Sequence, residues 1–146
     1  MKPTILCAED DPDDQFIISE AFKRTEIDTS LQFVVNGEQL LDYLYRRNGF
    51  EDPAQSPRPD LIFVDLRMPR NGHNAIKEIK SDPELGRIPI VVLTTSDHPD
   101  DVIRSFDMGV RAYIAKSEIF KYIPIVAAAI RKPWAAILEL PSSHRP

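Results

Sequence analysis

The sequence is poor in cysteine and in long apolar runs. Its 146 residues include a single cysteine, Cys7, so no disulfide can form within the chain and nothing indicates an oxidising compartment. Cys7 lies in the first apolar run, where a free cysteine behaves as a small buried apolar residue. No apolar stretch approaches the roughly 18 to 20 residues that span a bilayer, and the amino-terminal residues MKPTILCAED lack a signal-peptide pattern. We therefore expect a cytoplasmic protein.

Positive charge is also scarce relative to negative charge. The chain has 18 Lys and Arg residues against 23 Asp and Glu residues, which gives a net charge of −5. Nucleic-acid binding would need a clustered basic face, and the sequence shows none. At about one domain in length and without internal repeats, the chain has no spare length for a second folded unit. Any output is therefore expected to pass through contacts with other proteins.

Several common active-site motifs are missing too. The sequence contains neither G-x-G-x-x-G nor G-x-x-x-x-G-K-[ST], and its first acidic loop, AEDDPDD (8–14), would repel a phosphate anion unless a metal intervened. No serine lies in a G-x-S-x-G elbow. His73, His98 and His144 are scattered without metal-ligand spacing. These absences argue against flavin and nucleotide sites and against serine, cysteine or histidine nucleophiles.

Apolar runs instead alternate regularly with helix-period segments. The expected strands cover residues 4–9, 31–36, 59–65, 88–96 and 110–116, and the expected helices cover residues 11–24, 37–47, 75–86 in its first half, 98–109 and 117–132. Strands that are apolar throughout and alternate with helices predict a parallel sheet covered on both faces. Such a doubly wound α/β fold binds ligands beyond the carboxyl ends of its strands.

The first expected helix has a clear start signal. Asp11 is an N-cap acid, and Pro12 takes the first helical position. Asp13 and Asp14 then lie where acids favour the positive end of the helix dipole, so we assign these two residues to capping as well. The residues expected on the buried face of this helix are Ile17, Ala21 and Phe22.

Acidic residues end two of the expected strands. Glu9 and Asp10 end the first strand, and Asp65 ends the third. In a sheet that sets those strands side by side, the three carboxylates converge and repel one another unless a divalent cation lies among them. Hard oxygen ligands with open positions suit Mg²⁺, which pairs readily with a phosphoryl group. The acids therefore predict a magnesium site and phosphoryl chemistry, with a solvated loop acid as the alternative for Asp65.

Thr94 and Lys116 lie at the ends of the fourth and fifth expected strands. Taken singly, Thr94 is explained as a strand former and Lys116 as a surface lysine. Together with the three acids they complete the groups needed for phosphoryl transfer to a carboxylate, which are a nucleophile, metal ligands, a hydroxyl donor and a cation.

Four motifs contain these residues, and the set resembles the receiver domain of two-component response regulators. The motifs are the acid pair at 9–10, DLRMP (65–69), LTTS (93–96) and AYIAK (112–116). The resemblance covers roughly residues 4–131. It implies a flavodoxin-like, five-stranded parallel sheet of strand order 2-1-3-4-5, a receiver domain over residues 1–131 and an extension over residues 132–146.

The resemblance also implies a role for each residue at the strand ends. Asp65 would be the phosphoacceptor, Thr94 would bond a phosphoryl oxygen, and Lys116 would form an ion pair with the phosphoryl group. Tyr113 would turn inward on activation. The implied Mg²⁺ ligands are Asp10 and Asp65 directly, Glu9 through a water molecule, and the backbone carbonyl of Arg67.

A loop and the tail add a narrower resemblance. The proline-bearing stretch 49–59, expected to be a surface loop, and KPWAAILELP (132–141) are similar to single-domain regulators paired with phytochrome histidine kinases. This implies a phytochrome-linked histidine kinase as partner and a homodimer formed through the last helix and its extension. The apolar residues of the extension are Trp134, Ile137, Leu138 and Leu140. Folding of the tail back onto its own domain stays open as the alternative.

Three features depart from the common receiver pattern. Ser117 stands where many receivers carry proline after the lysine, so a cis peptide bond is not assumed there. Gly72 follows Pro69 after two residues, which makes the loop one residue shorter than usual and bears on the Arg67 carbonyl and on the start of the third helix. The acid pair is Glu-Asp rather than Asp-Asp.

Two functions compete, and a third is more distant. Intact acceptor, lysine and hydroxyl favour a phosphorylatable receiver, which is not a turnover enzyme. The alternative is a receiver-like interaction module that works without phosphorylation. An aspartate-nucleophile phosphatase would need a second acid two residues after Asp65, where this chain has Arg67.

Overall fold

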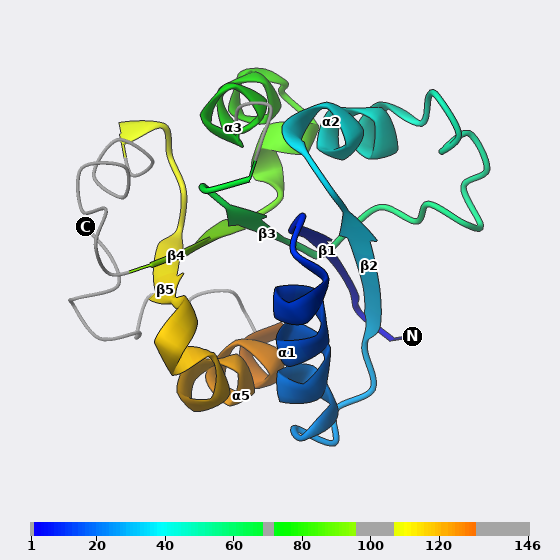
Figure 1. Cartoon of the computed structure of the whole chain (residues 1–146). Helices are drawn as coiled ribbons and strands as arrows, with labels where there is room; N and C mark the ends of the chain where they lie inside the picture. Colours follow the sequence, from blue (N-terminus) through cyan, green and yellow to red (C-terminus); the bar gives the residue numbers. More distant parts are fainter. Residues whose placement is uncertain (1, 69–71, 96–106, 131–146) are drawn as a thin grey trace.

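Five strands form the central layer of the protein, and helices cover both of its faces (Figure 1). The computed structural model describes residues 2–68, 72–95 and 107–130. The strands are β1 (Thr4–Ala8), β2 (Ser30–Val34), β3 (Leu61–Asp65), β4 (Ile90–Thr94) and β5 (Ala112–Ala115). The helices are α1 (Pro12–Lys23), α2 (Gly37–Tyr45), α3 (Gly72–Ser81) and α5 (Ile119–Ile130), with short 3₁₀ helices η1 (Leu85–Arg87) and η2 (Lys116–Glu118). Most of the helix expected over 98–109, and the tail from residue 131 onward, lie outside the described residues.

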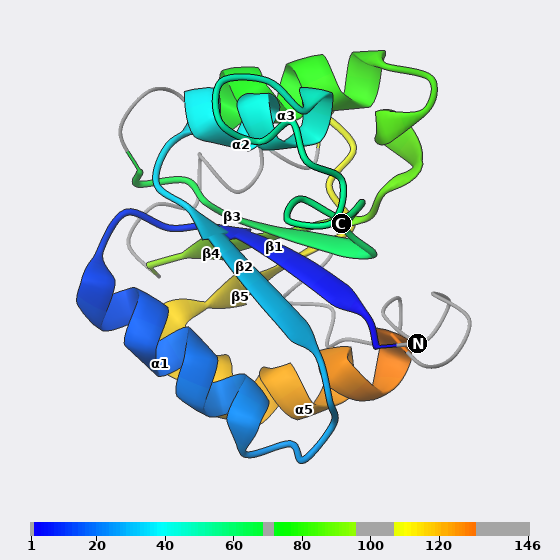
Figure 2. The ribbon, with the colours of Figure 1, turned by 90° about the vertical axis from the view of Figure 1, so that its right-hand side faces the viewer.

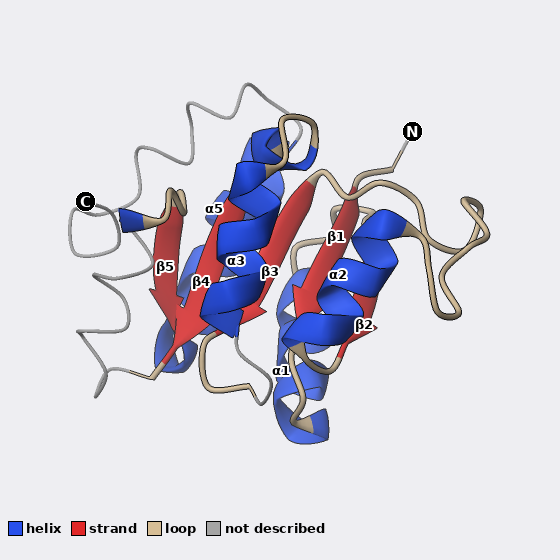
Figure 3. Ribbon diagram, turned by 90° about the horizontal axis from the view of Figure 1, so that it is seen from above, coloured by secondary structure: helices blue, strands red, loops and turns tan. Residues whose placement is uncertain are grey.

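All five strands are parallel and lie in the order β2-β1-β3-β4-β5. Figure 3 shows their arrows running in one direction, with α2 and α3 in front of the sheet. The chain leaves β1 toward one edge to form β2 and then crosses back to place β3 on the other side of β1. The predicted doubly wound fold of order 2-1-3-4-5 is therefore confirmed, and its switch point lies between β1 and β3.

The pleat of the strands divides the core into two layers. Because successive side chains of a strand point to opposite faces, Ile5 and Cys7 pack with α1 and α5, whereas Leu6 and Ala8 pack with α2 and α3. Figure 2 shows the two pairs of helices on opposite sides of the sheet. Burial on both faces explains why the strands are apolar throughout rather than alternating.

The start of α1 has the predicted cap. Asp11 adopts an extended conformation, and its side chain accepts a hydrogen bond from the backbone N–H of Asp13 at 2.8 Å. Pro12 follows as the first helical residue. The cap therefore fixes where the helix begins, directly after the acid pair.

The buried face of α1 differs from the predicted one by a single residue. Ala21 and Phe22 are buried as predicted, but Ile18 is the third buried residue, and Ile17 is 37% exposed. The prediction for Ile17 is therefore wrong. Ile18 lies three residues before Ala21 and four before Phe22, so it shares a helix face with both of these residues, whereas Ile17 shares a face only with Ala21.

Helix α2 ends two residues before its predicted end because Arg46 leaves the helical conformation. Arg46 adopts the left-handed region, with φ 54° and ψ 56°, so Tyr45 is the last helical residue. The chain then reaches β3 without a regular helix or strand, which confirms the loop predicted over 49–59. Most of the loop is exposed, but Ser56 and Pro59 are buried and anchor it.

The remaining described elements follow the predicted pattern with different bounds. Helix α3 begins at Gly72, three residues before its predicted start, and η1 takes up the second half of the predicted 75–86 segment. Strand β4 ends at Thr94 and β5 at Ala115. Among the described helices, none combines the length and apolar character needed to cross a membrane.

Candidate functional site

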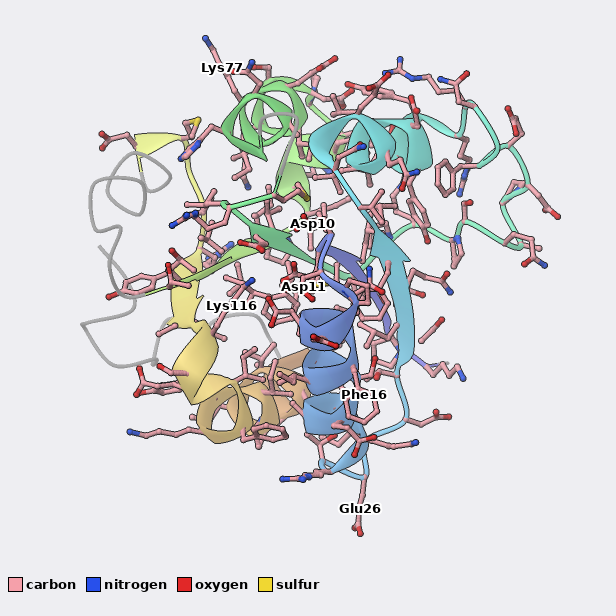
Figure 4. The ribbon with its side chains drawn as sticks, viewed as in Figure 1. Asp10, Asp11, Phe16, Glu26, Lys77 and Lys116 are labelled. Carbon is pink, nitrogen blue, oxygen red and sulfur yellow. The ribbon has the colours of Figure 1, made fainter. Side chains whose placement is uncertain are left out.

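The carboxyl edge of the sheet gathers the residues that the sequence singles out. Glu9 directly follows β1, Asp65 and Thr94 are the last residues of β3 and β4, and Lys116 directly follows β5. The register pairs Ala8 with Val64 and Asp65 with Leu93, so these strands end at the same level. In Figure 4 the labelled Asp10 and Lys116 lie at this edge, whereas Phe16, Glu26 and Lys77 lie away from it.

Three carboxylates converge there, as the acid pattern predicts. Glu9, Asp10 and Asp65 each offer an oxygen atom, and these oxygens lie within 4.8 Å of one another. Glu9 is completely buried and Asp65 is 1% exposed, whereas Asp10 is exposed. The cluster therefore consists of two buried carboxyl groups and one exposed carboxyl group.

Lys116 is the cation that faces these acids. Its Nζ lies 2.7 Å from Oδ2 of Asp65 and 3.0 Å from Oε1 of Glu9. Burial alone would lower the pKa of Lys116, but its hydrogen bonds with Asp14 and Asp65 and its ion pair with Glu9 outweigh burial and raise that pKa above the ordinary value. Lys116 is therefore charged at neutral pH.

One lysine does not balance the acids around it. Burial raises the pKa of Glu9 to about 8; the nearby Lys116 ammonium opposes this rise, and the neighbouring Asp65 adds to it. Although Oε1 of Glu9 lies close to Lys116, no hydrogen bond reaches this buried oxygen from the described residues. A buried carboxylate oxygen without a donor, beside two further carboxylates, fits a hard divalent cation such as Mg²⁺.

The two oxygens of Asp65 have different partners. Oδ1 accepts a hydrogen bond from the backbone N–H of Arg67 at 2.9 Å, and Oδ2 accepts one from Lys116 at 2.7 Å. Arg67 lies exposed in the turn that follows β3. These bonds hold the Asp65 carboxylate in one orientation at the end of its strand.

Thr94 and Tyr113 lie next to this centre on β4 and β5. Thr94 is 1% exposed, and its hydroxyl donates to the backbone carbonyl of Thr95 at 3.1 Å. Tyr113 is half-buried against the core layer on the α2 and α3 side. The hydroxyl of Thr94 is therefore bound to the backbone and not to Asp65.

Cys7 lies beneath the same acids. Its side chain is fully buried, which confirms the expectation of a small buried residue. Burial raises the pKa of its thiol, and the carboxylates of Glu9 and Asp65 raise it further. The thiol therefore stays protonated and unreactive.

Asp14 is the site residue that the sequence assignment missed. Its Oδ2 lies 2.7 Å from Nζ of Lys116, so it belongs to the charged centre and is not simply a capping acid. The only signal in the sequence was an excess of acids after Asp10, more than one helix cap needs. Residues 69–71 and the apolar tail residues Trp134, Ile137, Leu138 and Leu140 lie outside the described residues.

Comparisons with known proteins agree with this geometry. The model of the response regulator receiver domain matches residues 5–124. Response regulator Rcp1 of Synechocystis sp. is 36% identical over 140 residues, which cover 95% of this chain and 93% of Rcp1. The crystal structure of the phosphorylated cyanobacterial phytochrome response regulator RcpA is 33% identical with a TM-score of 0.79, covering 90% of this chain and 96% of RcpA. The crystal structure of the Mn²⁺-bound form of response regulator Rcp1 is 37% identical with a TM-score of 0.74, and the match covers 90% of this chain and 94% of the Rcp1 chain.

Proposed function

This chain belongs to the response regulator receiver domain family, and from that membership we propose that Asp65 accepts a phosphoryl group from a histidine kinase in a magnesium-dependent reaction. The observation that carries the proposal is the buried Asp65 carboxylate, which faces Lys116 at 2.7 Å and lies beside a Glu9 oxygen that accepts no hydrogen bond from the described residues. A purely structural acid would have its charge balanced locally. Here the surplus negative charge is kept where a strand ends and a ligand can reach it.

The proposed transfer makes one bond and breaks one. The phosphoryl group approaches in line with an Asp65 oxygen, the new O–P bond forms, and the N–P bond of the kinase phosphohistidine breaks with its electron pair left on the imidazole. Lys116 offsets negative charge on the transferring oxygens, and Arg67 N–H keeps the carboxylate oriented. Glu9, Asp10, Asp65 and the Arg67 carbonyl would hold Mg²⁺, which when bound adds positive charge beside the same oxygens.

The acyl phosphate on Asp65 would act as a switch. Thr94 would exchange its bond with the Thr95 carbonyl for one with a phosphoryl oxygen, and Lys116 would exchange Asp65 for the phosphoryl group. Each charge-assisted bond contributes about 1.5–3 kcal/mol net. Two of them approach the roughly 5.5 kcal/mol that moves a two-state equilibrium from 1:99 to 99:1. Tyr113 would then turn inward, in the position that Thr94 vacates.

The proposed partners follow from the relatives. RcpA is a phytochrome response regulator, so we propose that the kinase is phytochrome-linked and that both proteins work in the cytoplasm, where ATP is available to the kinase. Residues 132–146 are proposed to form a homodimer contact through Trp134, Ile137, Leu138 and Leu140. The protein would catalyse its own phosphorylation and slow dephosphorylation without being a turnover enzyme.

Incubation with acetyl phosphate and Mg²⁺, followed by intact mass measurement, tests the proposal. The wild-type chain should gain one phosphoryl group, and Asp65→Asn should gain none because the nucleophilic oxygen is lost. Asp13→Asn, which neutralises an exposed acid of the first turn of α1, is the matched control and should be phosphorylated. A wild-type chain that takes up no phosphoryl group would favour the phosphorylation-independent interaction module.

A further inference from the structure

Helix α1 places a third carboxylate, that of Asp14, beside Lys116. We propose that Asp14 competes with the phosphoryl group for this lysine and so limits how tightly the site holds a phosphoryl group; this rests on the proposed function of Asp65. Nζ of Lys116 lies 2.7 Å from Asp14 and 2.7 Å from Asp65, both closer than the 3.0 Å to Glu9. Asp14 is therefore as close a partner of the lysine as the acceptor itself.

The number of donors makes this competition direct. A lysine ammonium has three N–H donors, and three carboxylates surround Nζ of Lys116 within 3.0 Å. A phosphoryl group on Asp65 would bring its own oxygens to the same ammonium. Among the described residues, Lys116 already donates to Asp14 and to Asp65 and forms an ion pair with Glu9 at 3.0 Å. The phosphoryl group would therefore have to share this ammonium with the carboxylates around it.

A bound metal ion would weaken the hold of Glu9 and Asp65 on Lys116, but it would not weaken that of Asp14. Glu9 and Asp65 belong to the group of acids that fits a metal ion, and Asp14 does not. A bound divalent cation would therefore take over part of the charge of Glu9 and Asp65. Among the described residues, the Asp14 carboxylate would still have Lys116 as its ion-pair partner.

The start of α1 is tied to the site, so Asp14 stays close to it. The backbone N–H of Asp11 donates to Oε2 of Glu9 at 3.2 Å, and Nε2 of Gln15 donates to the backbone carbonyl of Glu9 at 2.7 Å. These bonds hold the first turn of the helix against the end of β1. The Asp14 carboxylate is thereby kept near Lys116 whether or not the phosphoryl group is present.

Three variants test the competition. Asp14→Asn removes the competing charge, Asp14→Glu keeps a carboxylate, and Asp13→Asn removes an equal charge from the same helical turn. Asp13 is exposed, and its backbone N–H, not its carboxylate, makes the bond to the Asp11 cap. Loss of helix-dipole stabilisation is therefore similar in Asp14→Asn and Asp13→Asn.

The measurement is the dissociation constant of beryllofluoride, an anionic mimic of the phosphoryl group, in the full chain at saturating Mg²⁺ by calorimetry. We expect Asp14→Asn to bind it about tenfold more tightly than wild type, the equivalent of ~1.4 kcal/mol. Asp13→Asn should change the constant by less than about twofold, as for a solvent-screened charge. Asp14→Glu should stay close to wild type, and Asp14→Ser, which also lacks the charge, should follow Asp14→Asn.

Two results would overturn the competition. Equal constants for Asp14→Asn and Asp13→Asn would show that the contact with Lys116 does not matter. Weaker binding by Asp14→Asn would show that Asp14 positions the lysine for the phosphoryl group and does not compete with it. Either result leaves the proposed function standing if the wild-type chain is phosphorylated and Asp65→Asn is not, so the two failures are distinguishable.

Discussion

Asp42 and Glu9 are both buried carboxyl groups, but they lie in opposite electrostatic situations. Asp42 of α2 is 7% exposed and accepts hydrogen bonds from Nε of Arg47 at 2.8 Å and Nδ2 of Asn48 at 3.1 Å. Glu9 is completely buried and shares one lysine with two other acids, and one of its oxygens accepts no hydrogen bond from the part of the chain that the structure describes. Among the described residues, Asp42 therefore has a cation nearby in the chain, whereas the hydrogen bond that Glu9 accepts from a chain neighbour comes from the uncharged backbone N–H of Asp11.

The difference separates a structural acid from a functional one. The partners of Asp42 are five and six residues away in the chain, and they shape the start of the loop that leads to β3. The neighbours of Glu9 come from α1, β3 and the end of β5, and most of them carry the same sign of charge. A fold keeps such surplus charge at a cost in stability, which a bound cation would offset.

The largest expected effect concerns Glu9 in protein kept free of metal by a chelator. Its folded-state pKa of about 8 lies above the ordinary 4.5, so the folded state binds more protons than the unfolded state between these values. The contribution of Glu9 to the free energy of unfolding should therefore be fully present below pH 4.5 and should be lost as the pH rises to about 8, by on the order of a few kcal/mol.

Glu9→Gln isolates this effect, because the amide keeps the shape and an acceptor for the Asp11 N–H. Urea unfolding at a series of pH values should show that the variant is more stable than wild type near pH 8, with the difference shrinking toward pH 5. A wild-type advantage at high pH would mean that Glu9 is fully compensated in the folded protein, as Asp42 is.

Magnesium should stabilise the wild-type chain through the same acids. A ligand present at about 100 times its dissociation constant raises the free energy of unfolding by about 2.7 kcal/mol. Asp10→Asn should lose most of this gain because Asp10 belongs to the acid group. Thermal unfolding with and without Mg²⁺ measures the gain, and Asp13→Asn, the matched control outside the group, should keep it. An equal gain in both variants would place the metal elsewhere.

Neutralising Asp42 should lower the stability of the protein, whereas Glu9→Gln should raise it near pH 8, and the change should be smaller. Asp42→Asn weakens the bonds from Arg47 and Asn48 without relieving any repulsion, so the melting temperature should fall by a few degrees at most. Phosphorylation by acetyl phosphate should be unchanged, since Asp42 lies on α2 and not at the carboxyl edge of the sheet. A rise in melting temperature would erase the distinction between Asp42 and Glu9.

Most of the fold was predictable from local patterns. The β3 run ending at Asp65 is apolar and β-branched, and the Asp11–Pro12 pair marks the start of α1, so both positions are where the sequence predicts them. The error at Ile17 arose because two adjacent isoleucines fit a helical period almost equally well. Ile18 shares a face with both Ala21 and Phe22, and the packing of α1 against the sheet places Ile18 in the core.

The acids of the site also include some that the sequence predicts and one that it does not. Glu9, Asp10 and Asp65 were predictable because strand ends of a parallel sheet meet at one edge, whatever the details of packing. Asp14 was not, since its distance to Lys116 depends on how α1 is rotated and tied against the end of β1. Of the three acids assigned to capping, Asp11 caps the helix as predicted, and Asp14 is the one whose role was assigned wrongly.

The order of residues along this chain was enough to determine a parallel sheet with acids, a hydroxyl and a lysine at its carboxyl edge, because periodicity and strand ends are local properties. The tertiary structure alone decided how many carboxylates share Lys116 and which oxygen of Glu9 lacks a donor. Those features depend on angles and distances between elements far apart in the chain, and charge balance is set by distance rather than by sequence order.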